Sequence, residues 1–379
     1  MSVSVRLLAC LFFVFTASAL AKPADKPGPA STDALIWRGD HTTGRAIMED
    51  LAKAYAKAKL GKITLQPFST VSGLDAVNNG SADIAGSARG KYARRVEEAN
   101  LEFAPIALDA AVLITHPKNP VRSLTLKQVH DIYFGRITNW KDLGGPDKEI
   151  NLYGIAAPLD GVEYSLRELI YGKGDQPVAV PRLYINTAKL EEAITLDPAG
   201  LGLSTLANSF ANKGIKALAI NGVEASVRSV ADGSYPLYIT LYTVNRADTP
   251  KQAEIDRYRA FLASPAAHEI FRRHQLIPYA DASALLANND ERIRRIDEQV
   301  GRGAVAAVAA ASSPPAATPP PRSAPHATLS AATAVAPTSA SAEAARANLA
   351  RAEAKRQAAA EAAQSKAGKT APAKGNSGN

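Results

Sequence analysis

Cysteine is almost missing from this chain: the single one, Cys10, lies in an apolar N-terminal segment. That segment has a positive charge at Arg6, an apolar run from Leu7 to Phe15 and small residues up to Ala21, which predicts a secretory signal peptide cut after Ala21. The run is too short for a stable membrane anchor. An uncleaved helix and lipidation at Cys10 are the alternatives. We therefore expect an exported mature protein without a disulfide or a thiolate nucleophile.

Signatures of enzymes and metal sites are missing as well. Neither Ser72 nor Ser87 lies in a Gly-x-Ser-x-Gly elbow. His41 stands between Asp40 and Thr42, but catalysis needs a base positioned on a nucleophile, and no such pair is evident. Six histidines are scattered without metal-ligand spacing, at positions 41, 116, 130, 268, 274 and 326. We predict that the protein is not an enzyme and has neither a metal nor a cofactor.

Excess basic charge is missing from the part of the chain that can fold. Residues 301–379 hold nine Lys or Arg and three Asp or Glu, and so carry +6 of the net charge of +8. A nucleic-acid interface needs basic residues concentrated on the folded part, so we exclude that class of partner. Residues 301–340 are rich in Ala, Pro and Ser and predict a disordered linker, and residues 341–379 predict a basic, partly helical tail. This tail is either simply solvated or a tether to anionic cell-envelope material.

The remaining chain, from about Ala34 to Val300, is long enough for two ordinary domains. Short apolar segments alternate with longer helical patterns, which is typical of an α/β protein with largely parallel strands. We predict strands at residues 34–37, 62–67, 82–85, 106–116, 150–154, 215–220 and 236–244, a short strand after residue 198, and helices at 44–59, 73–78, 125–134, 161–171 and 251–273, the last one broken near Ser264-Pro265.

Three loops place hydroxyl, Asp or Gly residues directly before a helix: residues 41–45 (HTTGR), 69–73 (STVSG) and 158–162 (PLDGV). Each exposes free backbone N–H groups at the positive end of a helix dipole. If the loops meet in one cleft, they form an anion site that needs no metal. The alternative is that each polar side chain is only an N-cap of its own helix.

The most distinctive string is LTLKQVHDIYFGRITNWKDLGG, within residues 123–145. Thr125 predicts an N-cap, the apolar residues fall at helical spacing, Gly135 predicts the helix end and Trp140 an anchor for the following turn. The string resembles a segment of the periplasmic phosphate-binding proteins of ABC transporters, the PstS-like solute-binding family. Later pieces resemble that family in the same order, including AGLGLSTLANS, Gly-x-Tyr-Pro-Leu and a terminal Ile-Pro, so that the resemblance spans about Leu35 to Tyr279.

This resemblance implies an α/β, two-lobed periplasmic-binding-protein-like fold of type II, in which each lobe has a mixed, mostly parallel sheet flanked by helices. The signal peptide would cover residues 1–21 and a linker 22–33. Residues 34–113 and 230–290 would form one lobe and 114–229 the other. The ligand, inorganic phosphate or a related oxyanion, would sit in the cleft, and closure of the lobes would signal occupancy to an ABC transporter permease. The implied location is the periplasm.

The resemblance also implies ligand-binding residues, and these match the family unevenly. Thr42 and Thr43 correspond to its first-loop hydroxyl, and Thr70, Ser72 and Gly73 to its Gly-Ser-Gly-x-Gly loop. Ser87 and Arg89 correspond to an Asp-Ile-x-x-Ser strand end, although the Asp of some members would fall at Ala88. In the second lobe an Arg and a Ser-Gly-Thr are replaced by a stretch containing Asp160 and Gly161, and this brings negative charge to the site.

Two functions therefore stay open. The first is a transport component that delivers phosphate or a related oxyanion to its permease. The second is a non-transport binding module, an oxyanion sensor or cell-envelope adaptor that uses the basic tail. Deletion of residues 301–379 separates them, because only an adaptor would lose its placement in the envelope.

Overall fold

The computed structural model describes residues 34–157 and 159–302. The predicted signal peptide, the linker at residues 22–33 and the tail beyond residue 302 lie outside the described residues and stay predictions. Within the described ranges, no helix combines the length and the apolar character needed to cross a bilayer.

The first lobe begins with three parallel strands. Strand β1 (Leu35–Asp40) lies between β2 (Ile63–Phe68) and β3 (Ile84–Ser87). After β1 come a short helix, α1 (His41–Thr43), a π-helix at Gly44–Met48 and α2 (Glu49–Lys57); α3 (Thr70–Asn78) follows β2. The predicted helices start too late, at residues 44 and 73, because Asp40 and Ser69 cap their helices earlier in the chain.

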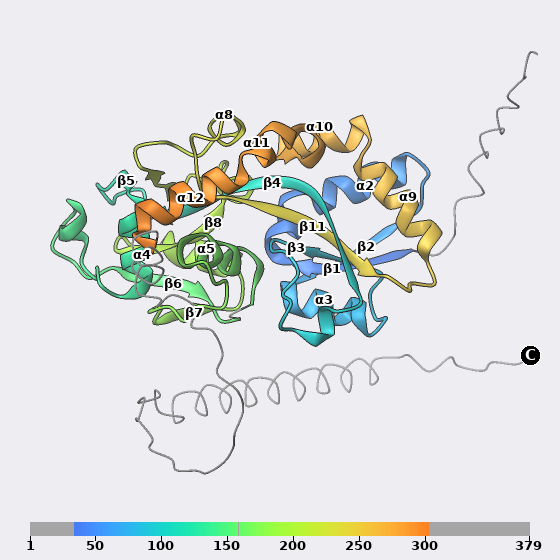
Figure 1. Cartoon of the computed structure of the whole chain (residues 1–379), viewed down its shortest axis with the longest axis horizontal. Coiled ribbons are helices and arrows are strands. Elements are labelled where there is room, and N and C mark those ends of the chain that lie inside the picture. Colours follow the sequence, from blue (N-terminus) through green and yellow to red (C-terminus); the bar gives the residue numbers. More distant parts are fainter. Residues whose placement is uncertain (1–33, 158, 303–379) are drawn as a thin grey trace, which may run out of the picture. The chain divides into compact units, whose positions relative to one another are not determined.

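A single long strand, β4 (Leu101–Thr115), joins the two lobes (Figure 1). Up to Ala110 it pairs antiparallel with β11 (Tyr238–Arg246), and from Ala111 onward with β8 (Gly200–Thr205). The sheet is therefore continuous, in the order β2-β1-β3-β11-β4-β8-β6-β7. In β4, the residues from Ile106 to Thr115 are buried, as expected for a strand that is covered on both faces.

The second lobe surrounds the parallel strands β6 (Asn151–Ile155), β7 (Arg182–Tyr184) and β8. Helix α4 (Leu126–Phe134) confirms the prediction, with Thr125 and Gln128 in a capping box and Gly135 in the left-handed conformation at φ 82°. Trp140 is fully buried and donates to the Ala199 carbonyl at 2.9 Å. The other elements of this lobe are β5 (Ser123–Leu124), α5 (Gly161–Tyr171), α6 (Thr187–Ile194), α7 (Leu206–Ser209), β9 (Lys216–Ala217) and β10 (Ala219–Ile220).

The last part of the described chain follows α8 (Val227–Ala231) and β11. The predicted break at Ser264-Pro265 is confirmed, because α9 (Gln252–Leu262) ends before it and α10 (Pro265–Arg273) begins at the proline. After β12 (Ile277–Pro278) come α11 (Ser283–Ala287) and α12 (Asn289–Val300), neither of which we predicted. Helix α12 lies against α4 and α5 of the second lobe.

Candidate functional site

Two of the three predicted loops meet directly. Thr70 is the first residue of α3 in one lobe, and Gly161 is the first residue of α5 in the other. The Gly161 amide donates to the Thr70 hydroxyl at 3.1 Å, and the Thr70 amide donates to a carboxylate oxygen of Asp160 at 3.2 Å. The positive ends of two helices from different lobes therefore meet directly.

The first loop contributes less free polar surface than its sequence suggests. Both the amide and the hydroxyl of Thr43 donate to the Asp40 carboxylate at 2.7 Å, and the Thr42 hydroxyl lies 3.2 Å from that of Thr187 in the second lobe. Asp40 is buried, and burial raises its pKa, although hydrogen bonds from Thr43 and Thr42 oppose this shift. We did not select Asp40 as a site residue; its place three residues before Thr43, from whose amide it accepts a hydrogen bond, is a helix N-cap position that could have revealed it.

In the second loop, the predicted residues divide into two groups. Thr70 is fully buried at the meeting point of the lobes. The Ser72 hydroxyl instead accepts from Arg38 at 3.0 Å, and Ser72 lines a separate hollow beside Arg38. Gly73 holds α3 close to β1, because a Cβ there would lie 2.5 Å from the Arg38 carbonyl oxygen. Ser72 and Gly73 thus have supporting contacts within the first lobe.

Arg89 reaches the second lobe, but most of its hydrogen-bonding capacity is used within the first. Its Nη1 and Nη2 donate to the two Glu98 oxygens at 3.0 and 2.6 Å, and its Nε donates to the Leu159 carbonyl at 2.9 Å. The Ser87 hydroxyl donates to the Arg89 carbonyl at 2.7 Å. The charge of Arg89 is therefore neutralised by Glu98, a residue that we did not predict and that carries no local signal of this role.

Asp160 belongs to the third predicted loop, in which the sequence departs from the family that it resembles. It stands at the N-cap position of α5, yet its side chain makes no capping hydrogen bond there and contacts Thr70 instead. It is only 8% exposed. Burial, followed by the charge of Asp40, raises its pKa to about 6, while the Thr70 and Gly161 amides and Arg89 oppose the shift. Two buried carboxylates therefore lie at this site.

Further contacts between side chains and backbone hold the lobes together around this point. The Arg45 guanidinium on the first lobe pairs with the buried Glu191 carboxylate at 2.7 Å. The Ser165 hydroxyl donates to the Ala88 carbonyl at 2.8 Å, and the Tyr92 hydroxyl to Asp175 at 3.0 Å. The described structure thus has the lobes in direct contact. Among the described residues, no group of three His, Cys, Asp or Glu is arranged to hold a metal ion.

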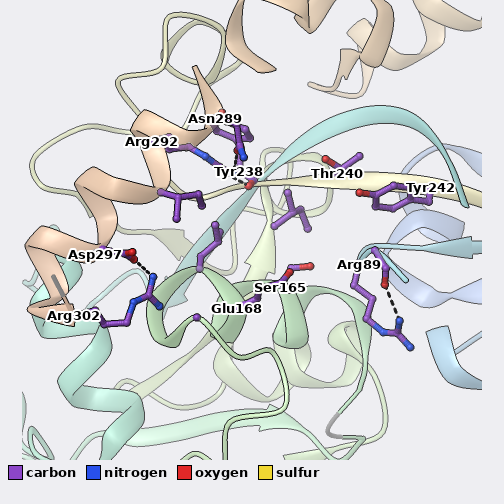
Figure 2. Close-up of a pocket in the computed structure, with 15 residues that line it drawn as sticks. Arg89, Ser165, Glu168, Tyr238, Thr240, Tyr242, Asn289, Arg292, Asp297 and Arg302 are labelled. Carbon is purple, nitrogen blue, oxygen red and sulfur yellow. Dashed lines mark hydrogen bonds and ion pairs between the residues drawn. The ribbon is translucent and has the colours of Figure 1, made fainter. Parts of the chain in front are cut away.

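A pocket of about 520 Å³ adjoins the site between β11, α5 and α12 (Figure 2). Figure 2 shows Arg89 at one end of it, with Arg292 and Arg302 at the other. Arg292 donates to the Pro236 and Tyr238 carbonyls at 3.1 and 2.8 Å, and Arg302 pairs with Asp297. Helix α12 therefore donates hydrogen bonds, through Arg292, to the residues at the start of β11 and just before it. The same helix packs against α4 and α5 of the second lobe.

The chain is similar to binding proteins of known structure. A model of the PBP superfamily domain matches residues 39–170. The phosphate-binding protein PstS of Borreliella burgdorferi is 23% identical over 245 residues, which cover 62% of this chain and 87% of that protein. A phosphate-bound structure described as a phosphate ABC transporter substrate-binding protein from Clostridium perfringens has a TM-score of 0.59 at 24% identity, covering 65% of this chain and 99% of that one. An ABC-type phosphate transport receptor from Vibrio cholerae has a TM-score of 0.52 at 24% identity, covering 65% and 100%. These similarities confirm the predicted two-lobed fold.

Proposed function

We propose, because the chain is a PstS-like member of the PBP superfamily, that it is the solute-binding component of an ABC transporter and captures phosphate or a related oxyanion between its lobes. The observation that carries this proposal is the direct contact between the α3 and α5 starts, which belong to different lobes, through the Gly161 amide and the Thr70 hydroxyl. Helix starts favour negative charge, because their first amides have no partner within the helix.

Binding would couple to movement of the lobes. An oxyanion bound beside the Gly161–Thr70 contact would accept hydrogen bonds from the start of α3 in one lobe and from the start of α5 in the other. It would therefore stabilise the arrangement in which the lobes touch, and a permease would recognise that arrangement. We also infer that the N-terminal signal is cleaved after Ala21 and that the mature protein acts in the periplasm, as expected for PstS-like proteins.

Isothermal titration of the mature protein with phosphate tests the proposal. Thr70→Ala is expected to weaken phosphate binding about 10-fold, because it removes the hydroxyl that faces Gly161, and the loss of one buried hydrogen-bond partner costs about 1–3 kcal/mol. His41→Ala is the control, with little expected change in Kd. Sulfate is titrated in parallel to define the ligand. Absence of heat with every oxyanion, from protein shown to be folded, would reject phosphate as the ligand.

The alternative function, an oxyanion sensor or envelope adaptor, is tested by removing residues 303–379. The truncation begins after Arg302 because that side chain pairs with Asp297 on α12. We expect the phosphate Kd and the rate of phosphate uptake by cells to be unchanged, since the described lobes contain the candidate site. Uptake is compared between cells that produce the full chain and cells that produce equal amounts of the truncated one. Loss of envelope retention together with unchanged phosphate affinity would instead support the adaptor.

A further inference from the structure

We propose that Asp160 is a resident anion of the binding site: its carboxylate holds the Thr70 amide, and an oxyanion binds only after this carboxylate is neutralised. This inference concerns regulation of the proposed phosphate site and rests on that function. The protonation state of Asp160 would thus determine the affinity of the site for an oxyanion.

The geometry supports this role because Asp160 makes the contact expected of a bound oxyanion. The Thr70 amide is one of the free donors at the start of α3, and it points to Asp160 Oδ1 at 3.2 Å. The carboxylate comes from the opposite lobe, from a residue 90 positions further along the chain. It does not cap its own helix. The same negative group therefore links the lobes at the place where a solute would link them.

The charges that face Asp160 leave it poorly compensated. Asp40 at the end of β1 is a second buried carboxylate, and Glu163 on α5 is a third acidic group whose pKa burial raises to about 7. The cation that faces Asp160 is Arg89, beyond the end of β3, and Glu98 neutralises it through both oxygens. An incoming oxyanion would thus meet ionised carboxylates beside a guanidinium that Glu98 already pairs, and this repulsion disappears at Asp160 when the group is protonated.

The sign of the pH dependence follows from the pKa of Asp160. Because burial and Asp40 raise this pKa to about 6, the carboxyl is largely neutral at pH 5 and largely ionised at pH 8. If only the neutral form admits the oxyanion, the apparent Kd is the intrinsic Kd divided by the neutral fraction. The apparent Kd then rises about 10-fold for each pH unit above 6, and by roughly 100-fold at pH 8.

The test is titration of phosphate into the mature protein and into Asp160→Asn at pH 5, 6, 7 and 8. The ratio of the two Kd values removes the ionisation of phosphate itself, which is common to both proteins. We expect the wild-type Kd to exceed that of the variant by roughly 100-fold at pH 8 and to match it at pH 5. Glu163→Gln is the comparison variant: it removes a nearby carboxylate on the same helix that does not touch Thr70, so its ratio to wild type should change with pH much less than the ratio for Asp160→Asn.

Each possible result has a defined meaning. A ratio that does not vary with pH, or the same variation in Glu163→Gln, overturns the role of Asp160 while the proposed function stands. Absence of phosphate binding by both proteins at pH 5 rejects the proposed function and this inference together. If Asp160→Asn does not fold, judged by circular dichroism, Asp160→Ser is measured in its place, because serine also removes the charge and is favoured at the N-cap position.

Discussion

Glu98→Ala is expected to lower the free energy of unfolding by about 3–5 kcal/mol, because it leaves a buried guanidinium without its partner. The side chains of Arg89 and Glu98 are both fully buried, and Glu98 accepts two hydrogen bonds from Arg89 and one from the Tyr92 amide at 2.8 Å. Denaturant unfolding of the mature protein, followed by circular dichroism, measures the loss.

Two further variants test the explanation. Combining Glu98→Ala with Arg89→Met should recover part of the stability, because no buried charge is then left unpaired. Glu192→Ala breaks the exposed pair between Lys189 and Glu192, and this should change stability little. A loss below 1 kcal/mol for Glu98→Ala would show that water reaches Arg89, and the description of this pair as a structural element would be wrong.

The Arg89–Glu98 pair also changes how binding data on Arg89 are interpreted. The sequence resemblance implied that Arg89 is a ligand-binding residue, and this stays a prediction. Because both Nη1 and Nη2 of Arg89 donate hydrogen bonds to Glu98, Arg89→Ala is expected to disturb folding as well as binding. Weaker phosphate binding by that variant therefore has to be compared with its stability before it is assigned to a lost ligand contact.

The sequence predicted best what local chemistry determines. Helix α5 was predicted with both bounds correct, because Asp160 and Gly161 start it and Gly172 adopts the left-handed conformation at its end. The Thr125 N-cap and the helix break at Ser264-Pro265 were also predicted correctly from the sequence. In each case, one or two residues with a strong backbone preference mark the boundary.

The missing parts depend on contacts between distant segments. Thr70 and Asp160 are 90 residues apart, and a helix start looks the same whether its cap bonds within the helix or across a cleft. Glu98 belongs to no recognisable sequence motif. It pairs with Arg89 only because the folded chain brings the two side chains together. Helix α12 lies beyond the region that resembles the family, and the few apolar residues on it, such as Ile296, become informative only once α4 and α5 are in place.

Gly161→Ala is expected to weaken phosphate binding roughly 10- to 100-fold by holding the lobes apart. A Cβ at this position would lie 2.8 Å from the Thr70 hydroxyl oxygen and 2.9 Å from both the Cβ and the amide nitrogen of Ala88. Thr70 and Ala88 belong to the opposite lobe, and the Ala88 amide nitrogen is backbone that cannot rotate away. Overpacking of this kind costs about 1–3 kcal/mol, and it acts only when the lobes meet. Titration with phosphate measures the loss.

Gly90→Ala is the control for the Gly161 prediction, since the atom nearest to its added Cβ, the Tyr242 hydroxyl oxygen, would lie at an ordinary 3.7 Å. Small-angle X-ray scattering should show a larger radius of gyration for phosphate-saturated Gly161→Ala than for phosphate-saturated wild type. Alanine is also a better helix former than glycine, so the variant should remain folded. Unchanged affinity and unchanged scattering would mean that phosphate does not need contact between the α3 and α5 starts, and the site would then have to be formed by the first lobe alone.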